Sequence, residues 1–597
     1  MGSIPPSTLP VLIVGAGPVG LALALDLGRR GVRTTIVERG PPTGTGELLA
    51  KASVINERTM EFCRLQGIRD EVAHSGFPED LPGDTVFCTG FGPGGKLIGQ
   101  LPMPSAETRE LPEQCCEMLQ RCPQFLFDPI FAKAVARQGM TDVRYGVELL
   151  KCEEDTTGVT CFLKKRSQTK DVAIGEEDQE EEHEQVRAQY VVACDGAGSV
   201  VRKALGIPFE GKDLGYTLSV IVKVDLAKYH NFPAGERYLF IGPESTWANF
   251  TTLDGRLLWR FTVVGSGQKL PDPAAFDMHA VLRRALGRDD AEYELMRVLQ
   301  WRRSQFTAAR YHSGGVTTNI IDIDQPSQTS QKSPARIFLA GDAAHTMSPT
   351  GGHGLNTGIG DISDLSWMLA AQLAGWGGPR LADAYEAERR PIALRNGAGS
   401  TKNFALWTDR VGRDKLLEDT PEGAAQRKAL GERMAGNMRQ EFQALGLALG
   451  YSYAGAGSFA AGAAVAGSHP GVSLIVPDGS GAPPDEPDVY VQTARPGHRA
   501  PHVWLEDGRS TLDLFGGDFV LLRLGDDSDD VGDGYERVVM AAKKVGMPVE
   551  VVRIDNKKVA ELYERRLVLV RPDGMVAWRG DVVPEDVERI VDVVRGA

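Results

Sequence analysis

The chain has 597 residues, enough for several domains, and its 42% hydrophobic and 24% charged residues are typical of a folded globular protein. With 66 basic and 80 acidic side chains the formal net charge is −14, which excludes a basic surface for nucleic acid or an anionic membrane. We find no signal peptide pattern and no apolar run that could span a bilayer, and expect a cytoplasmic protein. The eight cysteines show no zinc spacing, so we expect buried thiols and no metal site.

The first motif follows a short apolar run at residues 11–14. Gly15, Gly17 and Gly20 interrupt the chain there, helical apolar spacing continues to about residue 31, and a second apolar run ends at Glu38. This order of strand, glycine turn, helix, strand and acid is typical of a dinucleotide-binding unit. The glycines let the backbone approach a pyrophosphate at the helix N-terminus, and Glu38 is placed to accept hydrogen bonds from a ribose.

The middle of the chain changes character several times. Loops rich in proline and glycine extend to about residue 112, and the pattern then predicts a helix at 128–139 and strands at 143–152 and 160–164. An acidic run follows at 175–185, which we interpret as a solvated hairpin tip. A metal-binding role for Glu176, Glu177 and His183 has only weak support.

The second half begins with alternating apolar and polar residues at 216–264, which predicts an antiparallel sheet with one face toward water. Helical patterns follow at 361–374 and from 381 to about 449. The stretch 455–499 is rich in glycine, alanine and proline and is typical of a linker. Strands at 518–524, 549–554 and 567–570 and a helix at 584–594 then predict a separate α/β domain.

Two further turns repeat the strand and glycine pattern. Asp195 follows one apolar run, and Gly341 and Asp342 follow another, with a glycine-rich segment at 349–356 after it. Each aspartate alone could be the N-cap of an ordinary βα turn. Together with the first motif, they predict several contacts to one extended dinucleotide.

These three motifs resemble, in order and spacing, those of the single-component FAD-dependent aromatic hydroxylases of the para-hydroxybenzoate hydroxylase superfamily. The resemblance implies FAD as cofactor, with NADPH or NADH as co-substrate. The implied FAD contacts are Gly15, Gly17, Pro18, Gly20, Glu38, Arg39, Asp195, Gly341 and Asp342.

A closer resemblance is to the phenol hydroxylase-like branch, which includes polyketide hydroxylases. There a segment like 51–61 runs beneath the flavin, a glutamine like Gln124 lies near the cofactor, and a motif like 495–502 precedes a thioredoxin-like domain. The resemblance implies that Lys51 and Gln124 contact FAD. Relatives often have Arg at the position of Lys51, and some have Asp or His at that of Ser53.

The activity that the resemblance implies is hydroxylation of a phenolic or polyketide ring. NAD(P)H reduces the flavin, O2 adds at C(4a), and the hydroperoxide transfers a hydroxyl group to an electron-rich ring. We take Ser53, Pro349 and His353 as catalytic candidates, with His353 either at the flavin or bonded to a loop carbonyl. Pro349, Gly351, Gly354, Leu355 and Asn356 are expected to lie against the flavin, and Trp247, Phe250, Trp259 and Phe261 either to bind the substrate or to pack the sheet.

The fold expected is α/β, with a Rossmann-like FAD-binding domain, an interleaved antiparallel-sheet substrate domain and a C-terminal thioredoxin-like domain. Its expected boundaries are 1–210 and 336–455 for the FAD-binding parts, 211–335 for the substrate domain, 456–500 for the linker and 501–597 for the last domain. No cysteine follows Cys194, so the last domain cannot perform disulfide chemistry. We expect it to serve packing and oligomer contact in a homodimer.

Two alternatives stay open. The same scaffold supports Baeyer–Villiger oxidation or epoxidation in polyketide tailoring, which product NMR distinguishes from ring hydroxylation. A protein that binds flavin or NAD without turnover, such as a sensor, is the alternative from another class. The substrate, its regiochemistry and the choice between NADH and NADPH cannot be derived from the sequence.

Overall fold

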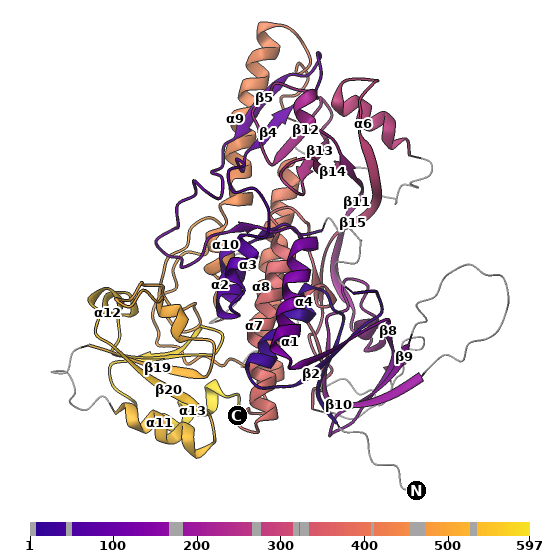
Figure 1. Ribbon diagram of the computed structural model, residues 1–597. Coiled ribbons are helices and arrows are strands. Elements are labelled where there is room, and N and C mark those ends of the chain that lie inside the picture. The colour runs from indigo at the N-terminus through magenta and orange to yellow at the C-terminus, as the bar shows by residue number, and fades with distance from the viewer. Residues whose placement is uncertain are drawn as a thin grey trace.

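A computed structural model describes residues 8–42, 51–165, 183–264, 276–314, 321–322, 334–407, 411–453, 472–525 and 534–597. Figure 1 shows three regions: a central sheet with long helices, a second sheet beside it, and a C-terminal domain. Glu176, Glu177 and much of the predicted linker lie outside the described residues.

The central sheet has parallel strands at its middle. β1 (Leu9–Val14) pairs with β10 (His183–Ala193) on one side and β2 (Thr34–Glu38) on the other, and β7 (Thr141–Tyr145) continues the sheet beyond β2. β17 (Ile337–Leu339) also pairs in parallel with β10. Because these strands run in the same direction, the three glycine-containing turns that follow β1, β10 and β17 meet at one edge of the sheet.

Further strands and helices complete this region. The order β16-β8-β9-β10-β1-β2-β7 includes an antiparallel extension, and the helices α1, α4 and α7 pack together beside the sheet. Gly146 separates β7 from β8 where the sequence predicted one strand. The remaining bounds are β8 Val147–Glu154, β9 Val159–Lys165, β16 Ile321–Asp322, α1 Pro18–Arg29, α4 Gln124–Gln138, α5 Val200–Ala204 and α7 His353–Leu373.

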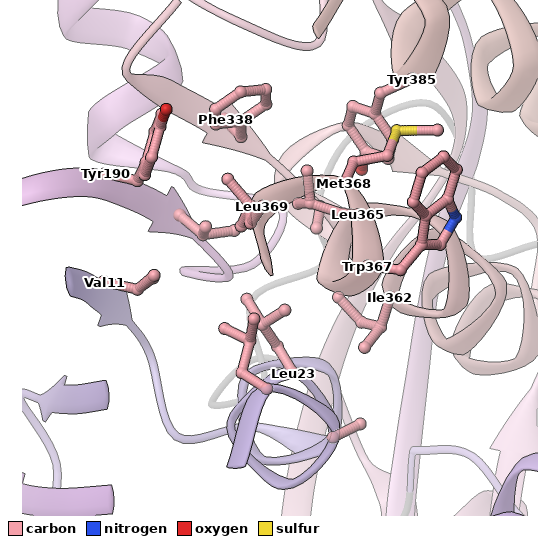
Figure 2. Packing of buried hydrophobic residues seen from close by; sticks show 14 of the residues in the cluster. Val11, Leu23, Tyr190, Phe338, Ile362, Leu365, Trp367, Met368, Leu369 and Tyr385 are labelled. Carbon is pink, nitrogen blue, oxygen red and sulfur yellow. The ribbon is translucent and has the colours of Figure 1, made fainter. Parts of the chain in front are cut away.

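Figure 2 shows the apolar core between the sheet and these helices. Val11 on β1 and Leu23 on α1 face a row of α7 side chains, including Ile362, Leu365 and Leu369. Burial of this row fixes the orientation of α7, whose N-terminus lies next to the glycine turns.

The second sheet has the order β18-β15-β11-β14-β13-β12-β4-β5. β4 and β5 lie in the proline- and glycine-rich stretch for which the sequence predicted loops, because strands this short give little periodicity. The bounds are β4 Thr85–Cys88, β5 Leu97–Leu101, β11 Phe209–Lys223, β12 Arg237–Ile241, β13 Thr246–Thr252, β14 Leu258–Val263, β15 Glu294–Ala308 and β18 His345–Thr346.

The two faces of the second sheet differ sharply in chemistry. One face carries a cluster of buried aromatic residues covered by α6 (Met278–Leu286). On β11, β13, β14 and β15 the opposite face carries threonine, serine and arginine side chains and is approached by α8 (Leu381–Trp407). On β4, β5 and β12 that face is apolar, and residues such as Phe87 and Leu239 pack against α9 (Pro421–Phe442). Alternation therefore separates an apolar core from a polar face only along the first group of strands.

Several short elements connect these layers. The sequence predicted continuous helical pattern up to residue 449, whereas the structure ends α8 at Trp407 and begins α9 at Pro421 with Thr420 as N-cap. The short elements are β3 Val54–Ile55, β6 Gln120–Arg121, α2 Glu57–Leu65, α3 Arg69–Ala73 and α10 Leu445–Leu449. No helix in the described part of the chain is long and apolar enough to cross a membrane.

The C-terminal region forms its own sheet, with the order β20-β19-β21-β22. The sequence predicted three of these strands and missed β22 (Val576–Gly580), a short run interrupted by tryptophan and arginine. The thioredoxin-like description stays a prediction. The other bounds are β19 Phe519–Leu524, β20 Val549–Ile554, β21 Leu567–Val570, α11 Tyr535–Lys544, α12 Lys557–Tyr563 and α13 Val587–Val594.

Candidate active site

A cavity of about 960 Å³ lies where the glycine turns meet the second sheet. It begins at Gly17 and Pro18, continues past Asp342 and residues 349–355, and ends against Arg260 and Trp301. Its length and its mixture of backbone and side-chain polar groups suit one extended ligand together with a smaller one.

The glycines of the first turn differ in whether the fold leaves space for a side chain. A Cβ at Gly15 would lie 2.5 Å from the carbonyl oxygen of Cys194, and one at Gly20 would lie 2.0 Å from that of Gly15. A Cβ at Gly17 meets nothing within 4 Å, and Gly17 is the N-cap of α1 without a side-chain cap. Gly15 and Gly20 thus permit close packing, whereas Gly17 presents the open helix N-terminus to the cavity.

Two of the acids predicted to contact the dinucleotide, Glu38 beside this turn and Asp195 in the turn after β10, are held by the backbone. Glu38 accepts hydrogen bonds from the backbone N–H groups of Ala16 at 2.9 Å and Gly40 at 2.7 Å, and Arg39 is exposed. Asp195 accepts from the backbone N–H of Val200 at 2.8 Å. None of these three residues lines the cavity. Asp195 therefore binds the first N–H groups of α5, whose N-cap is Ser199, while Gly196 and Ala197 face the cavity.

Asp342 lines the cavity from the turn after β17. Gly341, the residue before it, has a φ of 60°, a left-handed conformation that favours glycine. Burial by the surrounding protein raises the pKa of Asp342, and His345 and Lys51 oppose that rise. Asp361 on α7 accepts from the backbone N–H of Gly341 at 3.1 Å and pairs with His345 Nε2 at 2.7 Å. The turn that presents Asp342 is therefore fixed to α7 by a buried hydrogen-bond network.

The segment before α7 and its first turn form one wall of the cavity, through Pro349, Gly351, Gly354 and Leu355. α7 begins after Gly352, which has a φ of 70° and no side chain to cap the first turn. The free N–H groups of that turn therefore point their positive end toward this wall.

Asn356 lies behind the wall and does not line the cavity. It donates to the carbonyl oxygens of Val54 at 3.0 Å and Gly352 at 2.7 Å, and accepts from the backbone N–H of Asn56 at 3.0 Å. The predicted cofactor contact is thus a clamp that joins α7 to residues 51–56.

Residues 51–56 form the facing wall. Lys51, Ser53 and Gln124 line the cavity, and the backbone N–H of Gln124 donates to Ala52 at 2.9 Å. Arg121 reaches Ser53 Oγ at 3.4 Å and pairs with Glu236 at 2.5 Å. The sequence interpretation missed Arg121, although it lies only three residues before Gln124.

His353 lines the cavity at the first position of α7 and is only 6% exposed. Burial lowers its pKa to about 4, with a smaller contribution from Arg395. Its Nε2 has no hydrogen-bond partner among the described residues, so the loop-carbonyl interpretation finds no support at that nitrogen. At neutral pH the imidazole is uncharged and cannot act as a general acid.

We expect His353 to make the fold sensitive to acid. Its folded pKa of about 4 lies below the unfolded value of about 6.5, so its contribution to stability is complete above pH 6.5 and falls as the pH drops toward 4. Between pH 7 and pH 5 the loss is about 2 kcal/mol. Urea unfolding of wild type and His353→Gln at both pH values measures it, and an equal pH dependence in the two proteins would contradict the assignment.

The substrate end of the cavity is formed by groups that the sequence did not single out. Arg260 on β14 and Trp301 on β15 line it, with the Arg260 guanidinium 5.4 Å from the Trp301 ring centroid. Arg237, Glu236 and Glu441 also reach it. Strand parity places Arg237, Arg260 and Trp301 on the polar face of the second sheet, whereas Glu441 comes from α9. For Arg260, the alternation at 258–263 already contained this signal.

The four aromatic residues predicted to bind the substrate are not brought to the cavity. Phe250, Trp259 and Phe261 are buried in the cluster beneath α6, with Phe250 and Phe261 ring centroids 4.7 Å apart. Trp247 stacks on Phe240 at 5.3 Å beside the same cluster. The packing alternative is therefore the one that fits their surroundings, because side chains of successive strand residues point to opposite faces.

These features fit FAD. A pyrophosphate has open space at Gly17 and an uncapped helix N-terminus, and a ribityl or ribose hydroxyl has the Asp342 carboxylate. An isoalloxazine ring would lie between Pro349–Leu355 and Lys51–Val54, where two further glycines remove side-chain bulk.

Comparisons with known proteins agree with this geometry. Residues 8–318 and 324–398 match the FAD binding domain family, and residues 493–596 match the aromatic-ring hydroxylase C-terminal family. The 4-methyl-5-nitrocatechol 5-monooxygenase of Burkholderia sp is 30% identical, over 99% of this chain and 98% of that protein.

Two solved structures extend the likeness over the whole fold. The rebeccamycin biosynthetic enzyme RebC with reduced flavin has a TM-score of 0.81 and 34% identity, covering 99% of this chain and 100% of that one. A complex of aklavinone-11 hydroxylase with FAD and aklavinone has a TM-score of 0.71 and 26% identity, covering 100% of both chains. The chain therefore belongs to the family of FAD-dependent aromatic-ring hydroxylases, and it is a flavoprotein monooxygenase.

Proposed function

We propose that this enzyme hydroxylates a phenolic ring, either a simple phenol or the ring of a polycyclic polyketide, with NADPH or NADH as the electron donor. The observation that carries the proposal is one continuous cavity that joins the glycine turns to the polar face of the second sheet. Its volume of about 960 Å³ leaves space for an aromatic substrate beside the flavin ring.

Bound FAD would pass the electrons of NAD(P)H to O2, which is chemistry that no side chain provides. The chain holds it through Gly17, Pro18 and Asp342 and presents the N-terminus of α7 to its ring. The positive end of that helix favours negative charge on the ring. The catalytic candidates Pro349 and His353 act here as the wall that places the ring, since the His353 imidazole is uncharged at pH 7 and its remaining N–H is a very weak acid.

Proton transfer from the phenol is assigned to the opposite wall. Ser53 Oγ lies 3.4 Å from Arg121, whose guanidinium is paired with Glu236 at 2.5 Å and so offers only part of its charge to a negative oxygen at Ser53. A substrate hydroxyl at Ser53 would therefore lose its proton more readily, which raises the electron density of the ring. Met103, Met118 and Leu119 line the same region and exclude water.

The proposal predicts that substrate binding controls flavin reduction. Reduced flavin that is exposed to water gives its electrons to O2 and releases hydrogen peroxide, so reduction should depend on an occupied substrate site. We expect stopped-flow reduction by NADPH to be at least about tenfold faster with a true substrate than without it, which corresponds to about 1.4 kcal/mol of barrier. A panel from simple phenols to polycyclic polyketides, with NMR of each product, identifies that substrate. Equal rates with and without a compound that the enzyme hydroxylates would contradict the proposal.

Two other functions remain distinguishable in the same experiment. Lactone or epoxide products would favour Baeyer–Villiger oxidation or epoxidation. The homodimer and the cytoplasmic location stay predictions, and light scattering on the purified protein tests the first.

A further inference from the structure

A small polar chamber adjoins the substrate end of the cavity. It has a volume of about 40 Å³ and lies on the polar face of the second sheet. Arg237, Arg260, Trp301, Pro349 and Glu441 line both the chamber and the main cavity. The chamber has room for a few water molecules or one small ion, and none for an aromatic ring.

Arg303 forms the inner wall of this chamber. It lies on β15, is 7% exposed, and donates from Nε to Thr217 Oγ1 at 3.0 Å. Its guanidinium lies 4.8 Å from the ring centroid of Phe404. Within the described ranges, Arg303 forms no ion pair with a carboxylate, although a guanidinium has five N–H donors. A buried charge without a counterion is costly, so such a group normally has an anionic partner.

Glu441 supports the positive charge of Arg303 only in part, because Arg237, Arg260 and Arg303 share this carboxylate at the chamber. Glu441 pairs with Arg237 at 2.7 Å and accepts from Trp407 Nε1 at 3.1 Å, so its negative charge is already shared with another arginine. Arg260 brings another positive charge to the same wall and donates to the carbonyl oxygen of Lys51 at 3.2 Å. Burial lowers the pKa of Arg303 to about 10 and that of Arg260 to about 9, so both remain charged at neutral pH.

The rest of the chamber supplies neutral donors of the right kind. Thr217, Ser219, Thr251 and Thr262 contribute hydroxyl groups, and Asn249 contributes an amide. Hydroxyl and amide hydrogens around a guanidinium satisfy the several lone pairs of a carboxylate or halide.

We propose that this chamber is a binding site for a small monovalent anion, either a carboxylate carried by the aromatic substrate or a free anion. A carboxylate carried by the substrate rests on the proposed function, and it would make the preferred substrate an aromatic acid. Such a group would enter past Arg260 and Trp301 and pair with Arg303, which fixes the aromatic ring relative to Ser53 and Pro349. The free-anion form does not depend on turnover.

Matched probes test the two sources on the FAD-loaded protein. 1-Hydroxy-2-naphthoate and 1-naphthol differ by one carboxylate, and the change in flavin absorbance on titration gives the Kd of each. We expect the acid to bind at least about tenfold more tightly, as a charge-assisted pair in a buried site requires. Arg303→Gln, which keeps a polar side chain, should abolish that preference and leave 1-naphthol binding unchanged, and Arg303→Lys should restore part of it.

Bromide tests the free-anion source, since Trp301 and Trp407 line the chamber and report on it by fluorescence. Bromide replaces sulfate at constant ionic strength, and the tryptophan fluorescence is measured. Saturable quenching in wild type that is lost in Arg303→Gln would show anion binding beside Arg303. This result would support the free-anion source if 1-hydroxy-2-naphthoate and 1-naphthol bind with equal Kd. The control is Arg256→Gln, which removes the same charge from an exposed residue in the turn after β13. If Arg303→Gln does not fold, bromide anomalous scattering from wild-type crystals decides whether an ion lies beside Arg303.

The inference is overturned if wild type shows neither the acid preference nor saturable bromide binding, or if Arg303→Gln leaves both unchanged. Hydroxylation of neutral phenols by the same preparation would then leave the proposed function standing. Anion binding without any hydroxylation would support the site and remove the function.

Discussion

Replacing Arg571 with alanine is expected to destabilise the enzyme by about 3 to 5 kcal/mol, because the change leaves buried carboxylates without their cation. Arg571 follows β21 in the C-terminal domain and is fully buried. It pairs with both carboxylate oxygens of Glu388 on α8, each at 2.8 Å, and with Asp573 at 2.5 Å. Asp364 on α7 lies 4.0 Å away.

The position of this cluster explains the size of the effect. Glu388 and Asp364 belong to the two long helices of the FAD-binding region, so Arg571 joins that region to the C-terminal domain. The Arg571 guanidinium also lies 5.3 Å from the ring centroid of Trp367 on α7. Equilibrium urea unfolding followed by circular dichroism measures the loss. The matched control is Arg565→Ala, which breaks an exposed pair with Asp581 and should cost less than about 1 kcal/mol.

The loss should also depend on pH. Burial raises the pKa of both Glu388 and Asp364 above their ordinary values. Without Arg571 these carboxyl groups take up protons in the folded state more readily than in the unfolded state, so the variant regains stability as the pH falls below 7. A destabilisation that is below about 1 kcal/mol, or that grows as the pH falls, would contradict this account of the interface.

The sequence predicted the dinucleotide-binding part of the fold well because its signals are local. A strand, a glycine turn and a helix follow one another within 8–29, and the order alone indicates which ligand chemistry the turn accepts. The same holds for Asp342, which projects into the cavity from such a turn.

The substrate end could not be predicted in the same way, because it is assembled from distant residues. Arg260 and Arg303 lie on different strands and meet only through the pairing of β11 with both β14 and β15. The sequence offered aromatic residues as substrate contacts, yet Phe250, Trp259 and Phe261 lie on the face of the second sheet that points away from the cavity. An alternating strand pattern does not indicate which of its two faces will meet a ligand, because that depends on what covers the other face. Here α6 covers the aromatic face, so the polar face meets the cavity.

The glycines of the first turn give a second large effect, in which two neighbouring substitutions should have opposite consequences. Gly17 has a φ of −73° and a ψ of 178°, a conformation open to alanine, and a Cβ there meets nothing within 4 Å. Gly15 has a φ of 104°, and its Cβ would lie 2.5 Å from the carbonyl oxygen of Cys194. Alanine is therefore tolerated by the fold at residue 17 and opposed by backbone geometry at residue 15.

Gly17→Ala should consequently retain the stability of the FAD-free protein to within about 1 kcal/mol and bind FAD at least about tenfold more weakly, since the methyl group occupies the space of the pyrophosphate. Gly15→Ala should lower the stability of the FAD-free protein by about 2 to 5 kcal/mol. The ratio of flavin to protein absorbance after dialysis measures retention, and urea unfolding of the flavin-free proteins measures stability. Because a destabilised protein also loses cofactor, the discriminating result is Gly17→Ala with intact folding and reduced FAD binding. Full FAD retention by that variant would place the pyrophosphate away from the N-terminus of α1.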